Sequence, residues 1–202
     1  MVQLENVKKS FSKKLLFEIS TLSLDTGFTC LTGASGCGKT TLGRIICGLE
    51  KADSGIIHGI EGSSVVLFQE SRLLPSLTAY GNVAAVCRTD KGKRLGRELL
   101  TRLLFTDEDM NKHPSELSGG MERRVAIVRA VVFAFENNGS FALLDEPFTG
   151  LDPDTRKIAA DILKEHIGAR TVLVITHDDE ECELFGGNTV EFSSLLAPNT
   201  EI

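Results

Sequence analysis

The sequence predicts an α/β fold in which helices cover a mostly parallel sheet, with a small antiparallel sheet near the N-terminus and an inserted helical lobe. Short apolar runs rich in β-branched residues alternate with helical patterns, as expected for buried parallel strands joined by helices. Residues 2–7 and 15–24 instead alternate between apolar and polar side chains, which favours antiparallel pairing. Between Pro75 and about Phe135 the strand pattern is absent, so this stretch is predicted to be helical.

The elements of the core follow one another as strands and helices along the chain. The expected order is a strand at 28–32, a helix at 40–49, strands at 65–68 and 141–144, a helix at 153–167, a strand at 171–175 and a helix at 178–185. The helix at 153–167 has an apolar stripe with the helical period, formed by Ile158, Ile162, Leu163, His166 and Ile167. In the lobe, one helix face is expected to carry Leu99, Leu100, Leu103 and Leu104.

Composition limits the classes of protein to which the chain can belong. Its 202 residues are 42% hydrophobic and 25% charged, which fits one globular domain with a sizeable core. With 28 acidic against 22 basic residues, the net charge of −6 argues against a nucleic-acid partner. No apolar run approaches the roughly 18 residues that span a bilayer, and the first residues do not resemble a secretion signal. We therefore expect a cytoplasmic protein that works at a membrane only through partners.

The cysteines and histidines give no sign of a structural metal or of a disulfide framework. The 5 cysteines are an odd number and form no CxxC pair, and the 4 histidines are scattered. Cys37 differs from the others because it lies at the expected start of a helix, where a thiol is activated. We expect it to react with alkylating agents and to be protected by a ligand bound at this helix start; the alternative is a small filler residue without a role.

A glycine-rich segment at residues 33–40 carries the clearest chemical signal. Its sequence, GASGCGKT, fits G-x-x-x-x-G-K-[ST], follows an apolar strand and opens a helix, as in the core of P-loop NTPases. Glycines let the backbone approach a ligand, so that N–H groups converge on phosphate oxygens. Lys39 is expected to bind the β- and γ-phosphates and the Thr40 hydroxyl to bind Mg²⁺. The expected nucleotide ligands are Gly33, Ala34, Ser35, Gly36, Cys37, Gly38, Lys39, Thr40 and Thr41.

Two adjacent carboxylates, Asp145 and Glu146, end the apolar strand at 141–144. Paired acids at the end of a buried strand are costly unless a cation compensates them. Ligands of α/β folds bind at the carboxyl ends of the strands, so Asp145 is expected to bind Mg²⁺ and Glu146 to polarise an attacking water. The alternative is an acid pair that caps the next helix.

The segment at 117–121, LSGGM, resembles the LSGGQ signature of ABC-type ATPases, and the resemblance extends over essentially the whole chain. It implies that Gln69 is a ligand of Mg²⁺ and water, that His177 is the switch histidine at the γ-phosphate, and that residues 149–152, with Asp152, form the D-loop. Phe11 falls where the family stacks an aromatic ring on adenine, with Phe17 as the second candidate. The single domain, 1–202, would divide into a core lobe (1–74 and 136–192), a helical lobe (75–135) and a short tail (193–202).

The signature also has a physical reading, because Ser118, Gly119 and Gly120 stand at a predicted helix start and form a second anion-binding site. The family resemblance implies a head-to-tail dimer in which the signature of each copy closes on the ATP of the other. A capped helix start is the alternative for this segment taken alone.

The resemblance also suggests a transport role. Met121 replaces the usual glutamine, and both this change and the run from Phe68 to Val83 are similar to ATPases of nitrate, sulfonate and taurine importers. We therefore expect a motor subunit on the inner face of the cell membrane, with permease subunits and an extracytoplasmic solute-binding protein. Part of the permease docking groove would be formed by Leu73, Leu74, Pro75, Leu77 and Tyr80, for which packing within the lobe is the alternative. Three other functions remain open: an export ATPase, a non-transport ABC ATPase, and a P-loop kinase.

Overall fold

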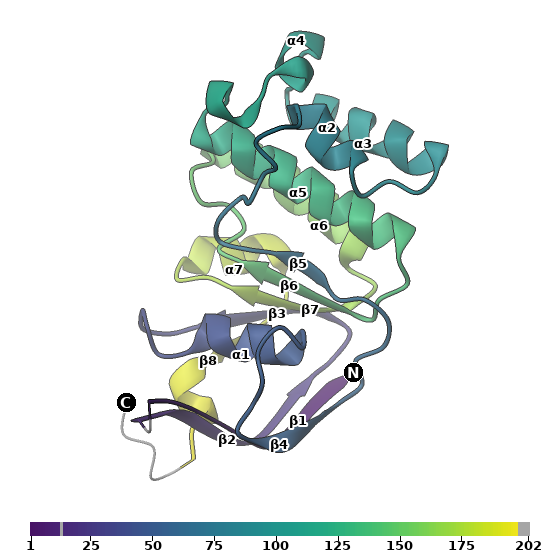
Figure 1. Ribbon diagram of the computed structural model, residues 1–202. Helices are drawn as coiled ribbons and strands as arrows, with labels where there is room; N and C mark the ends of the chain where they lie inside the picture. The colour runs from purple at the N-terminus through teal and green to yellow at the C-terminus, as the bar shows by residue number, and fades with distance from the viewer. Residues whose placement is uncertain (13, 198–202) are drawn as a thin grey trace.

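The computed structural model describes residues 1–12 and 14–197, which form two sheets with a helix between them (Figure 1). The larger sheet is parallel throughout and has the strand order β5-β6-β7-β3-β8. Its strands are β5 (Val65–Leu67), β6 (Phe141–Asp145), β7 (Thr171–Ile175), β3 (Gly27–Thr32) and β8 (Asn188–Glu191). Every residue of β6 and β7 is buried, which explains why both strands are continuous apolar runs.

The smaller sheet is antiparallel and has the order β2-β1-β4. It consists of β1 (Val2–Phe11), β2 (Lys14–Leu24) and β4 (Ser54–His58). Alternate residues of β1 point into the core, as the sequence pattern predicted.

One helix, α1 (Lys39–Ile46), fills the space between the two sheets (Figure 1). Its buried face joins one apolar cluster with both sheets, which includes Leu4, Phe17, Leu42, Ile46, Leu143 and Leu173. The helix lies so close to β6 that a Cβ on Gly43 would stand 2.6 Å from a methyl carbon of Leu143. Glycine at this position therefore sets how deeply α1, and the loop before it, sits against the parallel sheet.

The other face of the parallel sheet is covered by α5 (Gly119–Glu136), α6 (Pro153–Ile167) and α7 (Asp179–Phe185) (Figure 1). The stripe predicted on α6 is deeply buried at Ile162, Leu163 and Ile167. Helix α5 is buried on nearly all sides because it contacts β5 and α6 as well as the helices of the lobe. The signature segment thus opens a helix that runs from the lobe onto the sheet.

The lobe contains α2 (Ala79–Ala84), α3 (Asp90–Arg102), α4 (Asp107–Asn111) and the short 3₁₀ helix η1 (Pro114–Glu116). The expectation that Leu104 shares a helix face with the other leucines is wrong. Helix α3 ends at Arg102, and Leu104 has a φ of +65° and is 64% exposed, whereas Leu99 and Leu100 are fully buried. The helix therefore ends two residues before the last leucine of the pattern.

The segment expected to be a tail begins within η2 (Phe192–Leu195), a 3₁₀ helix that packs on β2. The ring of Phe192 is buried edge-on against Phe17, with ring centroids 5.7 Å apart. The N–H of Ala197 donates to the carbonyl of Glu18 at 2.8 Å. Residues 193–197 are therefore attached to the small sheet, and 198–202 lie outside the described residues. Within the described part of the chain, no helix is both long and apolar enough to cross a membrane.

Candidate active site

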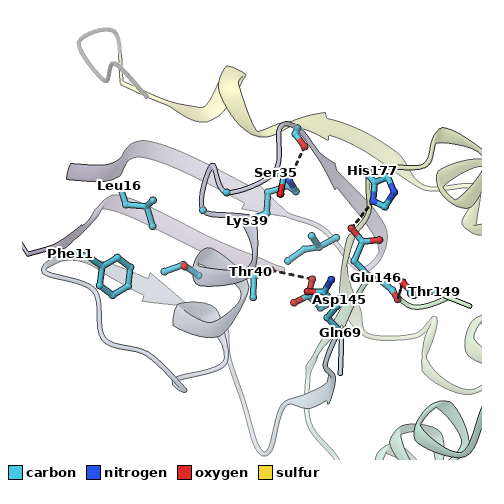
Figure 2. Close-up of a pocket in the computed structure, with 15 residues that line it drawn as sticks. Phe11, Leu16, Ser35, Lys39, Thr40, Gln69, Asp145, Glu146, Thr149 and His177 are labelled. Atoms are coloured by element: carbon cyan, nitrogen blue, oxygen red, sulfur yellow. Dashed lines mark hydrogen bonds and ion pairs between the residues drawn. The ribbon is translucent and has the colours of Figure 1, made fainter. Parts of the chain in front are cut away.

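A cavity of about 580 Å³ opens at the carboxyl ends of the parallel strands and brings most of the predicted chemistry together (Figure 2). It is lined by Phe11, Leu16, Gly33, Ser35, Gly36, Gly38, Lys39, Thr40, Thr41, Gln69, Asp145, Glu146, Thr149, Ile175 and His177. Its volume is that of a site for a small organic ligand. The residues come from five separate parts of the chain, which only the fold brings together.

The phosphate loop takes the shape that its glycines allow. Gly33, Gly36 and Gly38 have φ values of +138°, +80° and +114°, in the region that disfavours side chains. Gly38 caps the start of α1, whose first N–H groups face the cavity together with Thr40 and Thr41. The loop therefore provides a concave surface of N–H donors at the positive end of a helix.

Lys39 is 8% exposed, and its ammonium group is held by the loop itself. Nζ donates to the carbonyl of Gly33 at 2.7 Å and to that of Ala34 at 2.8 Å. These bonds pre-position a positive charge beside the loop, where phosphate oxygens can replace the carbonyls as acceptors.

Two predicted residues of the loop, Ala34 and Cys37, do not line the cavity as it is described here. Cys37 is 4% exposed and belongs to the cluster between the sheets, with its Sγ 3.8 Å from Nζ of Lys39. This burial argues against the expected alkylation, which stays a prediction, and is consistent with the alternative of a small filler residue.

The two carboxylates at the end of β6 have different surroundings. Asp145 is 3% exposed and accepts from the Thr40 hydroxyl at 3.2 Å, and burial raises the pKa of its carboxyl. Glu146 leaves the strand with a φ of +48°, and its carboxylate lies 2.9 Å from Nδ1 of His177 (Figure 2). The hydrogen bond and the charge of Glu146 raise the pKa of His177, whose side chain is 78% exposed. The turn of the backbone thus separates a buried acid from one that faces the open cavity.

The signature residues lie elsewhere: Ser118, Gly119 and Gly120 are not among the described residues that line the cavity. Ser118 caps α5 by accepting from the N–H of Met121 at 3.2 Å. A Cβ on Gly120 would lie 2.7 Å from the carbonyl oxygen of Gly150, so the signature packs tightly on the segment after Glu146. Ser118 and Gly119 at the start of α5 are exposed and lie outside the cavity. The first N–H groups of a helix have no partner within the helix, so this end can accept an anion.

Comparison with known proteins agrees with this arrangement. A sequence profile described as ABC transporter matches residues 20–149. The chain belongs to the ABC transporter family. As an ABC ATP-binding domain it is an ATP hydrolase, and both the resemblance and the fold class expected from the sequence are confirmed.

Several relatives of this ABC ATPase carry names of import systems. This chain is 36% identical over 194 residues to the aliphatic sulfonates import ATP-binding protein SsuB 1 of Pseudomonas syringae pv. tomato. The match covers 94% of this chain and 69% of the relative. The chain is 37% identical over 200 residues to the spermidine/putrescine import ATP-binding protein PotA of Lawsonia intracellularis, covering 90% and 53% of the two chains. Among solved structures, a dimeric post-hydrolysis state of the ATP-binding cassette MJ0796 bound to ADP and Pi matches with a TM-score of 0.79 and 26% identity, covering 95% and 94% of the two chains.

The donor atoms at the base of the cavity of the ABC ATPase fit Mg²⁺. Thr40, Asp145 and Gln69 offer hydroxyl, carboxylate and amide oxygens, the hard ligands that this ion prefers. Among the described residues, no group of three or more His, Cys, Asp or Glu side chains is placed to hold a metal. A site with few protein oxygens fits an ion that keeps waters and takes its other ligands from phosphates.

The apolar end of the cavity distinguishes the two aromatic candidates. Phe11 is 50% exposed and lines the cavity, and the ammonium of Lys9 stands 4.8 Å from its ring centroid. Phe17 is fully buried and does not reach the cavity. Leu16, which the sequence did not indicate, lies on the same side as Phe11.

Asp152 and Thr149 belong to the segment that was expected to form the D-loop. Asp152 does not line the cavity as described, and it caps α6 by accepting from the N–H and the hydroxyl of Thr155 at 3.0 and 2.7 Å. Thr149, in the expected D-loop, lines the cavity and donates to the carbonyl of Glu146 at 3.2 Å.

Proposed function

We propose that this chain is the ATP-hydrolysing motor subunit of a membrane import system for a small solute, and that it works as a head-to-tail dimer. The observation that carries the proposal is the division of the phosphate-binding groups. One cavity holds the phosphate loop, both carboxylates and His177, while the signature stands apart on an exposed helix start. A second copy related by a two-fold axis supplies the signature to each cavity.

Each group has one task in the proposed reaction. Lys39 and the loop N–H groups bind the β- and γ-phosphates, while Thr40, Asp145 and Gln69 hold Mg²⁺. When bound, the ion neutralises charge that develops on the phosphate oxygens. Glu146 orients the attacking water, and His177, hydrogen-bonded to Glu146, faces the γ-phosphate.

Adenine and the second copy of the chain occupy the remaining parts of the proposed ATP site. Phe11 stacks on adenine at the apolar end of the cavity, and Asp152 contacts the facing copy across the dimer. Ser118, Gly119 and Gly120 of the second copy close on the γ-phosphate. ATP binding therefore joins the two copies, and hydrolysis releases them.

The import role and the partners are supported by the printed names of the relatives, which are import ATP-binding proteins. We propose a peripheral location on the inner face of the membrane, with permease subunits and an extracytoplasmic solute-binding protein in the same system. The expected docking surface is only partly packed, since Leu74 is 50% exposed and Pro75 is exposed, whereas Leu73 packs against the core.

Glu146→Gln tests the proposed chemistry. The amide cannot take up a proton from water, so ATP turnover should fall by about 100-fold or more while ATP binding persists. Because hydrolysis no longer separates the copies, the variant should form a stable dimer with ATP, which size-exclusion chromatography measures.

The matched control is Glu183→Gln, which changes an exposed glutamate of α7 outside the cavity and should keep wild-type turnover. Wild-type turnover in Glu146→Gln would contradict the assignment of Glu146.

A further inference from the structure

Helix α5 carries a deeply buried arginine whose hydrogen-bonding capacity is completely used. Arg123 is 2% exposed. A guanidinium group has five N–H donors in a fixed plane, and each one here has a backbone carbonyl as acceptor. Nε donates to Pro147 at 2.8 Å, Nη2 to Asp145 at 2.8 Å and Glu146 at 2.6 Å, and Nη1 to Gln69 at 3.2 Å and also to Phe68.

This arrangement is a clamp on the backbone, because no side-chain carboxylate accepts a hydrogen bond from Arg123 in the described structure. Burial lowers the pKa of Arg123 to about 10, although the negative charges of Asp145, Glu181 and Glu146 act to raise it. The guanidinium group is therefore a cation at neutral pH. Removing such a charge from water is costly, and the five carbonyl dipoles offset that cost only when they converge on one plane. The plane of the guanidinium therefore fixes the positions of the carbonyls.

The clamped carbonyls belong to the two segments that carry proposed reacting groups. One is the segment directly after β5, which carries Gln69 into the cavity, and the other is the turn at the end of β6, which carries Glu146 into the cavity. The backbone of Glu146 has a φ of +48°, a conformation that a residue with a side chain rarely adopts. Its N–H donates to the carbonyl of Ile175 at 2.8 Å and its carbonyl accepts from Arg123. Strained backbone of this kind persists where surrounding bonds determine it.

We propose that Arg123 is a positioning residue for the reaction, which fixes Gln69 and Glu146 relative to each other and to the helix that begins at Ser118. The inference rests on the role of Glu146 proposed above. Arg123 does not itself line the cavity, so it acts through the backbone of the residues that do. If α5 moves with the lobe, Arg123 therefore shifts the backbone of Gln69 and the backbone of Glu146 together.

The chain offers a matched control at the opposite end of the parallel strands. Arg170 also donates to backbone carbonyls, those of Gly139, His166, Ala134 and Asn137. Ala134 and His166 lie in the last turns of α5 and α6, and Asn137 and Gly139 lie in the connection from α5 to β6. None of these residues lines the cavity. Arg170→Gln therefore removes the same kind of clamp without touching the site.

Arg123→Gln and Arg123→Lys test the proposal in the whole 202-residue chain. Both should lower kcat by about 100-fold, the scale of a misplacement near 1 Å. KM for MgATP and the Kd of ADP should change by less than about threefold, because the phosphate loop keeps its own contacts. Arg170→Gln should lower Tm and leave kcat within about threefold of wild type.

Hydrogen exchange separates positioning from general loss of stability. In both Arg123 variants, amides in peptides covering 68–72 and 145–149 should exchange faster, with those of α1 unchanged. In Arg170→Gln, faster exchange should occur around 134–139 instead.

The outcomes distinguish this inference from the proposed function. If Glu146→Gln abolishes turnover while both Arg123 variants keep wild-type kcat, only the inference fails. Full activity in Arg123→Lys with a slow Arg123→Gln would show that charge alone matters, and would overturn the clamp. Failure of both Arg123 variants to fold, or an equal loss of kcat in Arg170→Gln, would likewise overturn it in favour of a structural role. If Glu146→Gln retains wild-type turnover, the role proposed for Glu146, on which this inference rests, fails.

Discussion

In the phosphate loop, Gly36 and Gly38 both adopt positive φ values, +80° and +114°. Their surroundings differ. A Cβ on Gly36 would meet no heavy atom within 4 Å, whereas one on Gly38 would lie 2.8 Å from Cδ1 of Phe17. Gly36→Ala therefore adds backbone strain alone, and Gly38→Ala adds a clash with the buried core as well.

This difference predicts two separable losses of stability. The free energy of unfolding should fall by about 1 kcal/mol in Gly36→Ala and by about 3 kcal/mol in Gly38→Ala. Urea denaturation without nucleotide measures both. Equal losses in the two variants would contradict the packing of the loop against Phe17.

At the residue scale, the sequence predicts ligands that stand next to one another in short motifs. Lys39, Asp145 and Glu146 lie in one cavity as expected, because each motif is local in the chain. Leu16 could not be predicted. Lys9 pairs with Phe17 and Ser10 with Leu15, so Leu16 is the extra residue of a β-bulge, and a bulge redirects its side chain toward the cavity. The burial of Cys37 likewise depends on the packing of both sheets rather than on its place before a helix.

At the scale of elements, the buried strands and long helices were predictable because their apolar periods are strong. The strands β4 and β8 were not. Both lie at sheet edges, and four of the five residues of β4 are exposed, so neither has a distinct apolar pattern. In β4, Gly55 approaches Asn6 so closely that a Cβ would stand 2.5 Å from its carbonyl oxygen. Pairing with a distant strand, rather than local sequence, determines this element.

The short helix α4 depends on a capping box that makes its stability sensitive to acid. The Thr106 hydroxyl accepts from the N–H of Asp109 at 3.1 Å, and the Asp109 carboxylate accepts from the N–H and the hydroxyl of Thr106 at 3.1 and 2.7 Å. With the ion pair to Lys112 as the largest cause, these bonds lower the pKa of Asp109 to about 2. A carboxyl whose pKa falls on folding stabilises the protein above its usual pKa, and this contribution disappears as the pH falls through the lowered value.

Asp109→Asn should therefore lower Tm at pH 7, and the difference from wild type should shrink as the pH falls from about 4 towards 2. Thermal unfolding followed by circular dichroism measures it. Glu108→Gln is the control, because it removes an exposed carboxylate of the same turn that accepts no backbone N–H in the described structure. A Tm difference for Asp109→Asn that is constant over this pH range would contradict the role of the carboxylate.

At the scale of the whole molecule, the two segments proposed to bind phosphate stand on one chain but do not share a cavity. The phosphate loop leads into α1 between the sheets. The signature opens α5, and this helix packs both on the helices of the lobe and on the parallel sheet. The sequence could identify both segments, but not their separation in space, since that depends on how α5 crosses from the lobe to the sheet. In the proposed mechanism, this separation is the reason that a second copy is needed.

Mixing two inactive variants tests this central claim most directly. Glu146→Gln keeps the signature intact, and Ser118→Arg keeps the cavity intact, so each homodimer lacks one half of both sites. A mixed dimer contains one complete site, formed by Glu146 of one copy and Ser118 of the other. An equimolar mixture should recover ATP turnover, up to about a quarter of the wild-type rate if the sites act independently. A mixture no more active than the average of the two separate variants would contradict the account.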